Sequence, residues 1–215
     1  MNLGYFITFE GGEGIGKTTQ VSMLNGYLKE SGYAVKSVRE PGQTDLGLRI
    51  RELLLHTDLK INERAEALLF EAARAALVDE IIQPHLNDNE IVISDRFFDS
   101  TTAYQGYARG LNITQLYALN DFATNGLVPN LTFLIDINPE LGLSKLVAER
   151  EGPDRFEREK LEFHEKVRQG FLAIARNNPN RFVVVDYIES GINKMQDLIR
   201  SEVYERISKR SLKRT

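Results

Sequence analysis

The sequence contains no cysteine among its 215 residues, which excludes disulfides, thiolate metal ligands and a cysteine nucleophile. It also lacks any apolar run that approaches the ~18 residues of a membrane span. The opening MNLGYFITFE has neither a basic region nor the apolar core of a secretory signal. Together these absences predict a cytoplasmic protein without a membrane partner.

Excess positive charge is missing as well. The formal net charge is -4, and the one basic cluster is the tail ISKRSLKRT, which is typical of a solvated chain end. We therefore expect no nucleic-acid partner. The length, and the absence of a linker or an internal repeat, favour a single domain over residues 1–215.

Runs rich in β-branched and aromatic residues alternate with longer stretches of helical period. The runs cover 5–10, 33–40, 90–95, 131–137 and 181–186. This alternation predicts an α/β fold, a five-stranded parallel sheet flanked by helices in three layers. A long helix is expected over 61–86, with Pro84 interrupting it near its end. Residues 148–160 are mostly charged around a Gly-Pro pair, and we expect a short lid there.

Residues 11–18 read GGEGIGKT and match the phosphate-loop pattern G-x-x-x-x-G-K-[ST] between a predicted strand and a predicted helix. Backbone N–H groups and the helix N-terminus would hold phosphate oxygens, with the lysine ammonium near the β- and γ-phosphates and the threonine hydroxyl on Mg²⁺. The residues expected to bind ATP here are Gly11, Gly12, Glu13, Gly14, Ile15, Gly16, Lys17, Thr18 and Thr19.

Two common phosphate-loop classes are disfavoured. A guanine-reading N-K-x-D is absent, since NKMQD at 193–197 is one residue too long. ATPase motors carry adjacent acids at a strand end, whereas the third predicted strand ends in Asp95 and Arg96. That pair suits an acid on the water shell of the metal and a base on a second, phosphate-bearing substrate.

Four further segments follow the phosphate loop in order: REPG at 39–42, FEAAR at 70–74, DRFFDSTTAYQGYARG at 95–110 and EGPDRFE at 151–157. With them the chain resembles the thymidylate kinase (dTMP kinase) family over nearly its whole length. The resemblance implies transfer of the γ-phosphoryl group of ATP, with Mg²⁺, to dTMP, and a homodimer. Another nucleotide kinase and a non-catalytic phosphate-loop regulator remain as alternatives.

Arginines at strand ends are suited to the acceptor phosphate, because ligands gather at the carboxyl ends of parallel strands. Arg39 and Arg96 occupy such positions. Arg51 is either a solvated helix residue or, as the resemblance implies, a third phosphate ligand. Asp95 is expected to orient waters on Mg²⁺, while Glu40 is either a second such acid or a helix cap.

The acceptor base would meet a helix and a loop. Phe70 and Arg74 lie four residues apart, so they share a helix face; the FEAAR match implies stacking on thymine and donation to its carbonyl. The resemblance also assigns Gln105 to the thymine edge, Thr101 to the base or its water, and Tyr104 to a wall against a ribose 2'-hydroxyl. Glu13 is expected to face the 3'-hydroxyl of the acceptor sugar.

The phosphate loop contains no arginine, so the family resemblance places the catalytic arginine in the lid. Arg150 is the candidate, with Arg155 supporting the lid or the nucleotide, and Lys17 and Arg96 complete the catalytic set. His56, His85 and His164 are expected on helix surfaces or ends without a role. Gln43 replaces a second glycine after REPG, which predicts backbone strain if that position needs a positive φ.

Overall fold

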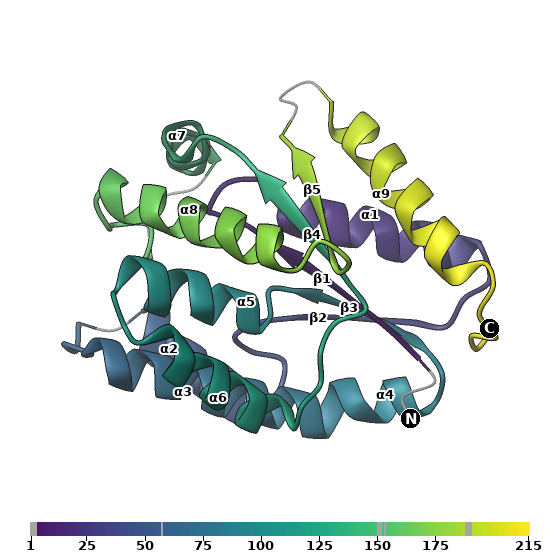
Figure 1. Ribbon diagram of the computed structural model, residues 1–215, viewed down its shortest axis with the longest axis horizontal. Coiled ribbons are helices and arrows are strands. Elements are labelled where there is room, and N and C mark those ends of the chain that lie inside the picture. Colours follow the sequence, from purple (N-terminus) through teal and green to yellow (C-terminus); the bar gives the residue numbers. More distant parts are fainter. Residues whose placement is uncertain (1–3, 57, 150–151, 153, 188–190) are drawn as a thin grey trace.

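The computed structural model describes residues 4–56, 58–149, 152, 154–187 and 191–215. Its centre is a five-stranded sheet in the order β2-β3-β1-β4-β5, in which every pair is parallel (Figure 1). The predicted α/β fold and its strands are confirmed. The strands are β1 (Tyr5–Glu10), β2 (Val35–Arg39), β3 (Ile91–Asp95), β4 (Leu131–Asp136) and β5 (Phe182–Asp186).

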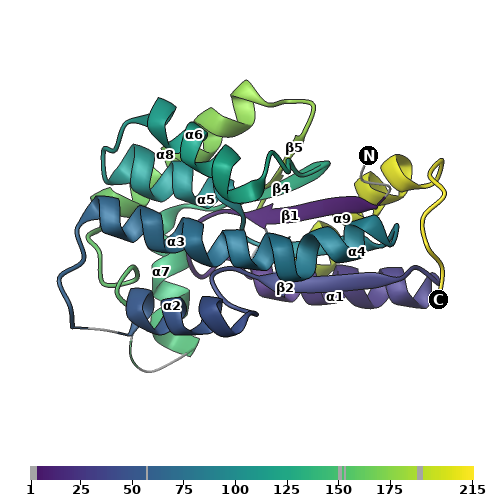
Figure 2. The same ribbon diagram turned by 90° about the horizontal axis from the view of Figure 1, so that it is seen from below.

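Helices cover both faces of the sheet (Figures 1 and 2). Within the described ranges, every helix is too short or too polar to span a bilayer. The α-helices are α1 (Lys17–Glu30), α2 (Asp45–Leu55), α3 (Glu63–Leu77), α4 (Gln83–Asn87), α5 (Phe98–Thr101), α6 (Ile113–Thr124), α7 (Pro139–Glu149), α8 (Leu161–Asn177) and α9 (Ile192–Ile207), and the π-helical segments are η1 (Val78–Ile82) and η2 (Thr102–Ala108).

The central strand β1 is buried along its whole length on both faces. Ile7 and Phe9 pack in one core cluster with Leu24 of α1 and Ile199 of α9. Phe6 points the other way and packs in a second cluster with residues of α3, η1 and α4. This burial fixes β1, and therefore the phosphate loop that follows it, in the middle of the molecule.

The helix expected over 61–86 runs on to Asn87, so Pro84 does not interrupt it near its end. The π-helical segment η1 lies between α3 and α4 and shifts the hydrogen-bond register before the proline is reached. Pro84 then falls in the first turn of α4, where the missing N–H is tolerated.

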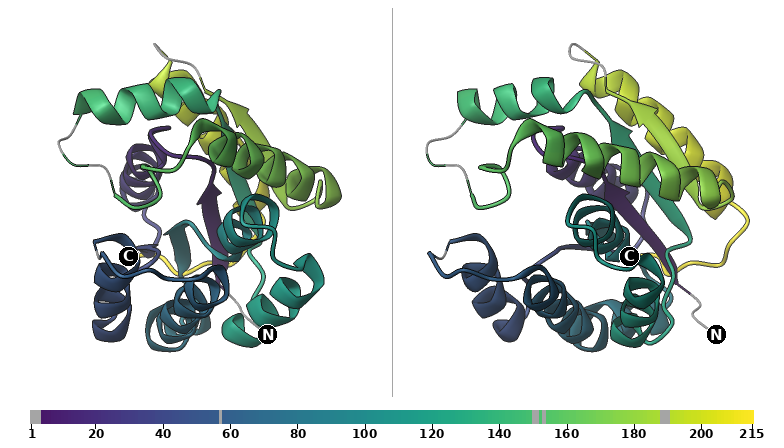
Figure 3. Two further views of the ribbon diagram at one scale, coloured as in Figure 1. Left: turned by 90° about the vertical axis from the view of Figure 1, so that its left-hand side faces the viewer. Right: turned by 60° about the vertical axis from the view of Figure 1, so that its left-hand side comes forward.

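The carboxyl ends of the strands lie at one end of the molecule, which faces the viewer in Figure 3 (left). There, the start of α1 (purple) lies between α7 and α8 (greens) above it and α2 and α3 (blues) below it. Ligands of open parallel sheets bind at this end of the strands.

Gln43 adopts a φ of 72, in the left-handed region that favours glycine. Its side chain is exposed, directly before Thr44, whose side chain caps α2.

We expect Gln43→Gly to raise the free energy of unfolding by about 0.5–1 kcal/mol, because relief of the left-handed strain exceeds the entropy that glycine adds to the unfolded chain. Urea denaturation measures this difference. Gln43→Ala is the control, since it keeps the Cβ; equal stabilisation by alanine would contradict the explanation.

Candidate active site

The phosphate loop forms the floor of a cavity of about 510 Å³. Gly14 and Gly16 have φ values of 66 and 76, and a Cβ on Gly14 would lie 2.0 Å from the carbonyl oxygen of Gly142 in α7. Glycine is therefore required at position 14 both by conformation and by the close approach of α7. The loop ends at Lys17, where α1 begins, so that the positive end of this helix faces the cavity.

Lys17 lies at the start of α1 with its ammonium turned into the loop. Its Nζ donates hydrogen bonds to the carbonyl oxygens of Gly11 and Gly12. Burial lowers the pKa of Lys17 most, and the nearby Arg96 lowers it further, so that it falls to about 8 although Glu13 and other carboxyl groups oppose the shift. An ammonium with this pKa is charged at neutral pH and gains most from an incoming phosphate.

We expect the affinity for ATP to fall as the pH rises above about 8, because Lys17 then loses its proton in the free protein while bound phosphate favours the protonated form. Binding at pH 9 should therefore take up a proton. Calorimetric titration in two buffers of different ionisation enthalpy measures this uptake. Lys17→Arg stays charged and should abolish the Lys17 contribution; binding by the wild type without proton uptake would contradict the assignment.

Thr18 and Asp95 meet at the edge of the phosphate loop. The Thr18 hydroxyl donates to Oδ2 of Asp95 over 2.6 Å, and both residues line the cavity. In the described part of the chain, no group of three or more His, Asp or Glu side chains is placed to hold a metal. One hydroxyl and one carboxylate fit Mg²⁺, which keeps several waters and takes further oxygens from substrate phosphates.

The negative charge of Glu13 is balanced by partners on the opposite wall of the cavity. Its Oε1 accepts hydrogen bonds from Nη2 of Arg96 over 2.7 Å and from the hydroxyl of Tyr104 over 2.6 Å. Burial raises the pKa of Glu13, but Arg96, Lys17 and the Tyr104 hydrogen bond outweigh it and lower the pKa to about 2. The carboxylate in the phosphate loop is thus held ionised, and its charge is balanced by Arg96.

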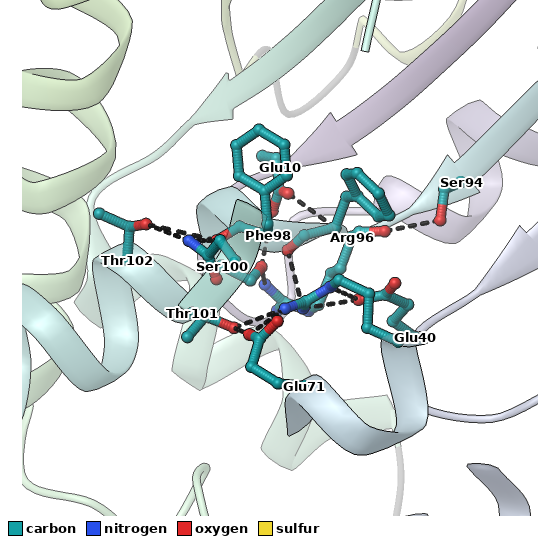
Figure 4. Close-up of polar contacts among 12 residues, drawn as sticks. Glu10, Glu40, Glu71, Ser94, Arg96, Phe98, Ser100, Thr101 and Thr102 are labelled. Carbon is teal, nitrogen blue, oxygen red and sulfur yellow. Dashed lines mark hydrogen bonds and ion pairs between the residues drawn. The ribbon is translucent and has the colours of Figure 1, made fainter. Parts of the chain in front are cut away.

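Arg96 is held in a strained backbone conformation at the end of β3, with a φ of 74. Its carbonyl oxygen accepts a hydrogen bond of 2.6 Å from the Ser94 hydroxyl (Figure 4), and its Nη1 donates to the carbonyl oxygen of Gly11 and to Ser100. Residues in this region are rare outside glycine and cluster at functional sites. The conformation turns the guanidinium across the phosphate loop.

Most of the residues proposed from the sequence line this one cavity. Among the residues proposed to bind the phosphoryl acceptor, all three arginines and both aromatic residues line the cavity. Those that line it are Glu13, Gly14, Ile15, Gly16, Lys17, Thr18, Thr19, Arg39, Arg51, Phe70, Asp95, Arg96, Thr101, Tyr104 and Gln105. Arg51 also donates to the carbonyl oxygen of Pro41, which orients it inward from α2.

Arg74 lies behind the wall instead of on it. Its side chain is 1% exposed, and each of its guanidinium nitrogens has a partner, among them Glu40, Glu71 and Thr101. Figure 4 shows the side chains of Glu40, Glu71 and Thr101 close to one another. Donation from Arg74 to a base stays a prediction, and in this structure Thr101 and Glu40 are the members of the group that line the cavity. The sequence left two roles open for Glu40, an acid near the metal or a helix cap. In the structure Glu40 forms an ion pair with Arg74.

Arg155 is likewise drawn away from the cavity. Its Nη1 lies 2.7 Å from Oε2 of Glu66, and its Nε donates to the carbonyl oxygen of Leu54 at the end of α2. Arg150 lies outside the described residues. The nucleotide contacts assigned to both arginines stay predictions.

His164 is buried in α8, whereas the sequence placed it on a helix surface. Burial lowers its pKa, although Glu13 opposes this shift. The apolar stripe of α8, which includes Phe163, Val167 and Phe171, carries the neighbouring position 164 into the interior. The ring packs edge to face on Phe163, with centroids 5.5 Å apart.

The sequence did not identify several residues that line the cavity or lie directly behind its wall. Lys145 of α7 lies with its Nζ 5.1 Å from the ring centroid of Tyr187, and both line the cavity beside the phosphate loop. Glu66 and Glu71 of α3 are buried acids in contact with Gln105 and Thr101. In the sequence they are only acids on the same predicted helix as Phe70. Exposed helices commonly carry acids, so this position did not distinguish them.

A phosphate loop at the end of the central strand, with a hydroxyl and carboxylate pair and arginines on the facing wall, defines a P-loop kinase of the nucleoside monophosphate type. The family model described as thymidylate kinase matches residues 9–199. The chain belongs to the thymidylate kinase family and is a kinase.

Individual relatives agree with this family over almost the whole chain. A thymidylate kinase of Deinococcus radiodurans is 44% identical over 98% of this chain and 99% of its own length. One of a Sulfurihydrogenibium species is 52% identical over 86% of this chain and 89% of its own. The crystal structure of thymidylate kinase from Ehrlichia chaffeensis has a TM-score of 0.78 and 35% identity, and covers 93% of this chain and 98% of that one.

Proposed function

We propose that this chain transfers the γ-phosphoryl group of ATP to dTMP, giving ADP and dTDP, with Mg²⁺ and in the cytoplasm, as a step of dTTP synthesis. One observation carries the proposal. The same cavity is lined on one side by the phosphate loop and on the other by Arg39, Arg96, Phe70 and Gln105. A donor phosphate and a phosphate-bearing, flat acceptor therefore fit face to face in one space.

Positioning and charge do the chemical work in this reaction, since phosphoryl transfer needs no covalent nucleophile. The backbone N–H groups of the loop and Lys17 hold the donor phosphates. Arg39, Arg51 and Arg96 hold the acceptor phosphate, with Arg96 kept in place by Glu13. Bound Mg²⁺ would neutralise charge on the donor phosphates, and Thr18 and Asp95 are the residues that would hold it.

The acceptor base lies against Phe70, which is half-buried in the cavity wall. Gln105 meets its edge and Tyr104 closes the wall near the sugar. The Tyr104 hydroxyl is fixed between Glu13 and Arg96, at 2.6 and 3.2 Å, so this wall cannot yield easily to an added ribose hydroxyl. Exclusion by a rigid wall is the physical route to preference for deoxyribose.

A panel of monophosphates assayed with ATP and Mg²⁺ tests the substrate. We expect the highest kcat/KM for dTMP and residual activity with dUMP, because one methyl group is worth only ~1–3 kcal/mol in a fitted pocket. Greater activity with a purine monophosphate would show that the acceptor is a purine nucleotide and not dTMP. ATP hydrolysis that no monophosphate stimulates would favour a regulatory nucleotide-binding protein.

The same proposal includes a homodimer. Leu53 of α2 and Leu68 of α3 are 43% and 57% exposed, and the two helices pack side by side (Figure 2). Exposed leucines on adjacent helices support pairing of these faces with a second copy. Sedimentation at micromolar concentration should give a dimer, and a monomer there would contradict this part of the proposal.

A further inference from the structure

Glu66 is a buried acid that contacts the residue proposed to meet the acceptor base. It lies in α3 with its side chain 1% exposed, and its Oε1 accepts a hydrogen bond of 2.8 Å from Nε2 of Gln105. Gln105 comes from η2, 39 residues further along the chain, and lines the cavity. The contact thus joins two elements of the cavity wall below its surface.

The chemistry of this contact sets the orientation of the Gln105 amide. An ionised carboxylate only accepts hydrogen bonds, whereas an amide has a donor nitrogen on one side and an acceptor oxygen on the other. Gln105 must therefore turn its nitrogen to Glu66. Its carbonyl oxygen then lies on the side of the amide away from Glu66, on a residue that lines the cavity.

Two guanidinium groups hold Glu66 in this role. Arg155 lies 2.7 Å from its Oε2, and Arg109 donates to both oxygens over 3.3 Å. Arg109 is itself held by Glu159, at 2.7 Å, in the segment before α8. Contacts to both of its oxygens from two guanidinium groups hold the Glu66 side chain in one rotamer. The arrangement makes it a fixed acceptor for Gln105.

We propose that Glu66 is a positioning residue that sets the base preference of the site by presenting the carbonyl oxygen of Gln105 to the acceptor base. An acceptor at this place selects a base with a ring N–H, such as the imide of thymine or uracil. It disfavours cytosine, whose corresponding ring nitrogen is itself an acceptor. The inference rests on the proposed function insofar as Gln105 meets the base edge.

The test compares the binding of dTMP and dCMP to the whole protein by calorimetry without ATP. Glu66→Gln allows the neighbouring amide to flip, because a glutamine at this place can donate as well as accept. We expect the ratio of the dCMP to the dTMP dissociation constant to fall about tenfold or more, the size of one matched contact in a buried site. A ratio equal to that of the wild type, in a variant with the wild-type melting temperature, would overturn the inference.

The double variant Glu66→Gln with Gln105→Glu is the rescue. It exchanges the two groups, so that an ionised oxygen again faces the base, and the preference for dTMP should return. Glu162→Gln is the matched control, since it removes one negative charge from an exposed residue at the start of α8 and leaves Glu66, Arg109 and Gln105 as they are, and the ratio should stay at the wild-type value. A loss of preference in the folded double variant would contradict the inference.

Two further results separate the inference from the proposed function. Equal binding of dTMP and dCMP by the wild type would contradict dTMP as the preferred substrate, independently of the role of Glu66. If neither variant folds, hydrogen exchange of the Gln105 side-chain amide in the wild type with dTMP bound decides. We expect an NH₂ group protected by Glu66, and rapid exchange would contradict the role of Glu66 alone.

Discussion

Replacing Arg150 by alanine is expected to lower kcat by ~10³, the low end of the effect of an arginine finger. The two cations that contact the phosphate loop in the described residues, Lys17 and Arg96, are already engaged. Lys17 is bonded to carbonyl oxygens of the loop, and Arg96 is paired with Glu13 and bonded to Gly11. The loop itself has no arginine. A further positive charge is needed on the transferring phosphoryl group, and we propose that Arg150 supplies it.

Steady-state kinetics with saturating ATP and dTMP measure this effect. Arg158→Ala is the control, because Arg158 is an exposed arginine of the same segment and its removal changes the net charge equally. We expect Arg158→Ala to have a kcat close to that of the wild type. An unchanged kcat in Arg150→Ala would refute the assignment, and a large loss in both variants would point to the total charge of the segment instead.

Arg74→Ala is expected to lower the free energy of unfolding by about 3–5 kcal/mol, because it leaves two buried carboxyl groups without their cation. Glu40 and Glu71 are both nearly inaccessible and both contact Arg74. Burial already raises the pKa of Glu40 to about 7, against the opposing attraction of Arg74. Without the guanidinium, ionisation of Glu40 costs more and its pKa in the folded protein rises further, so the loss of stability should be larger at pH 8 than at pH 5.

Urea denaturation at both pH values measures the loss, and Arg74→Lys is its control. Lysine keeps the charge but cannot reach Glu40, Thr101 and the carbonyl oxygen of Phe97 together, so we expect an intermediate loss. A loss below about 1 kcal/mol for Arg74→Ala, the range of an exposed ion pair, would show that the group is not the buried support described above.

The parts of the molecule that the sequence predicted are those with local signals. The five strands follow from short apolar runs, and the phosphate loop follows from glycine, lysine and threonine at fixed offsets. Gln43 shows that even a departure from a pattern is informative, since the positive φ expected of a glycine position is present there. In each case the residues that decide the conformation are neighbours in the chain.

Partners that are distant in the sequence could not be predicted. Arg74 shares a helix with Phe70, but whether its guanidinium reaches a ligand depends on Glu40, 34 residues away. Arg155, in the segment before α8, pairs with Glu66 of α3. The π-helical segment η2 and the strained φ of Arg96 have no compositional signature. They depend on tertiary packing that only the folded chain supplies.

Acceptor-dependent phosphoryl transfer is tested most directly by measuring the release of ADP from ATP and Mg²⁺ with and without dTMP. A coupled assay should show ADP formed in proportion to dTMP consumed, with almost none in its absence, and Lys17→Ala should abolish the signal. The same slow release of ADP with and without dTMP would contradict the account.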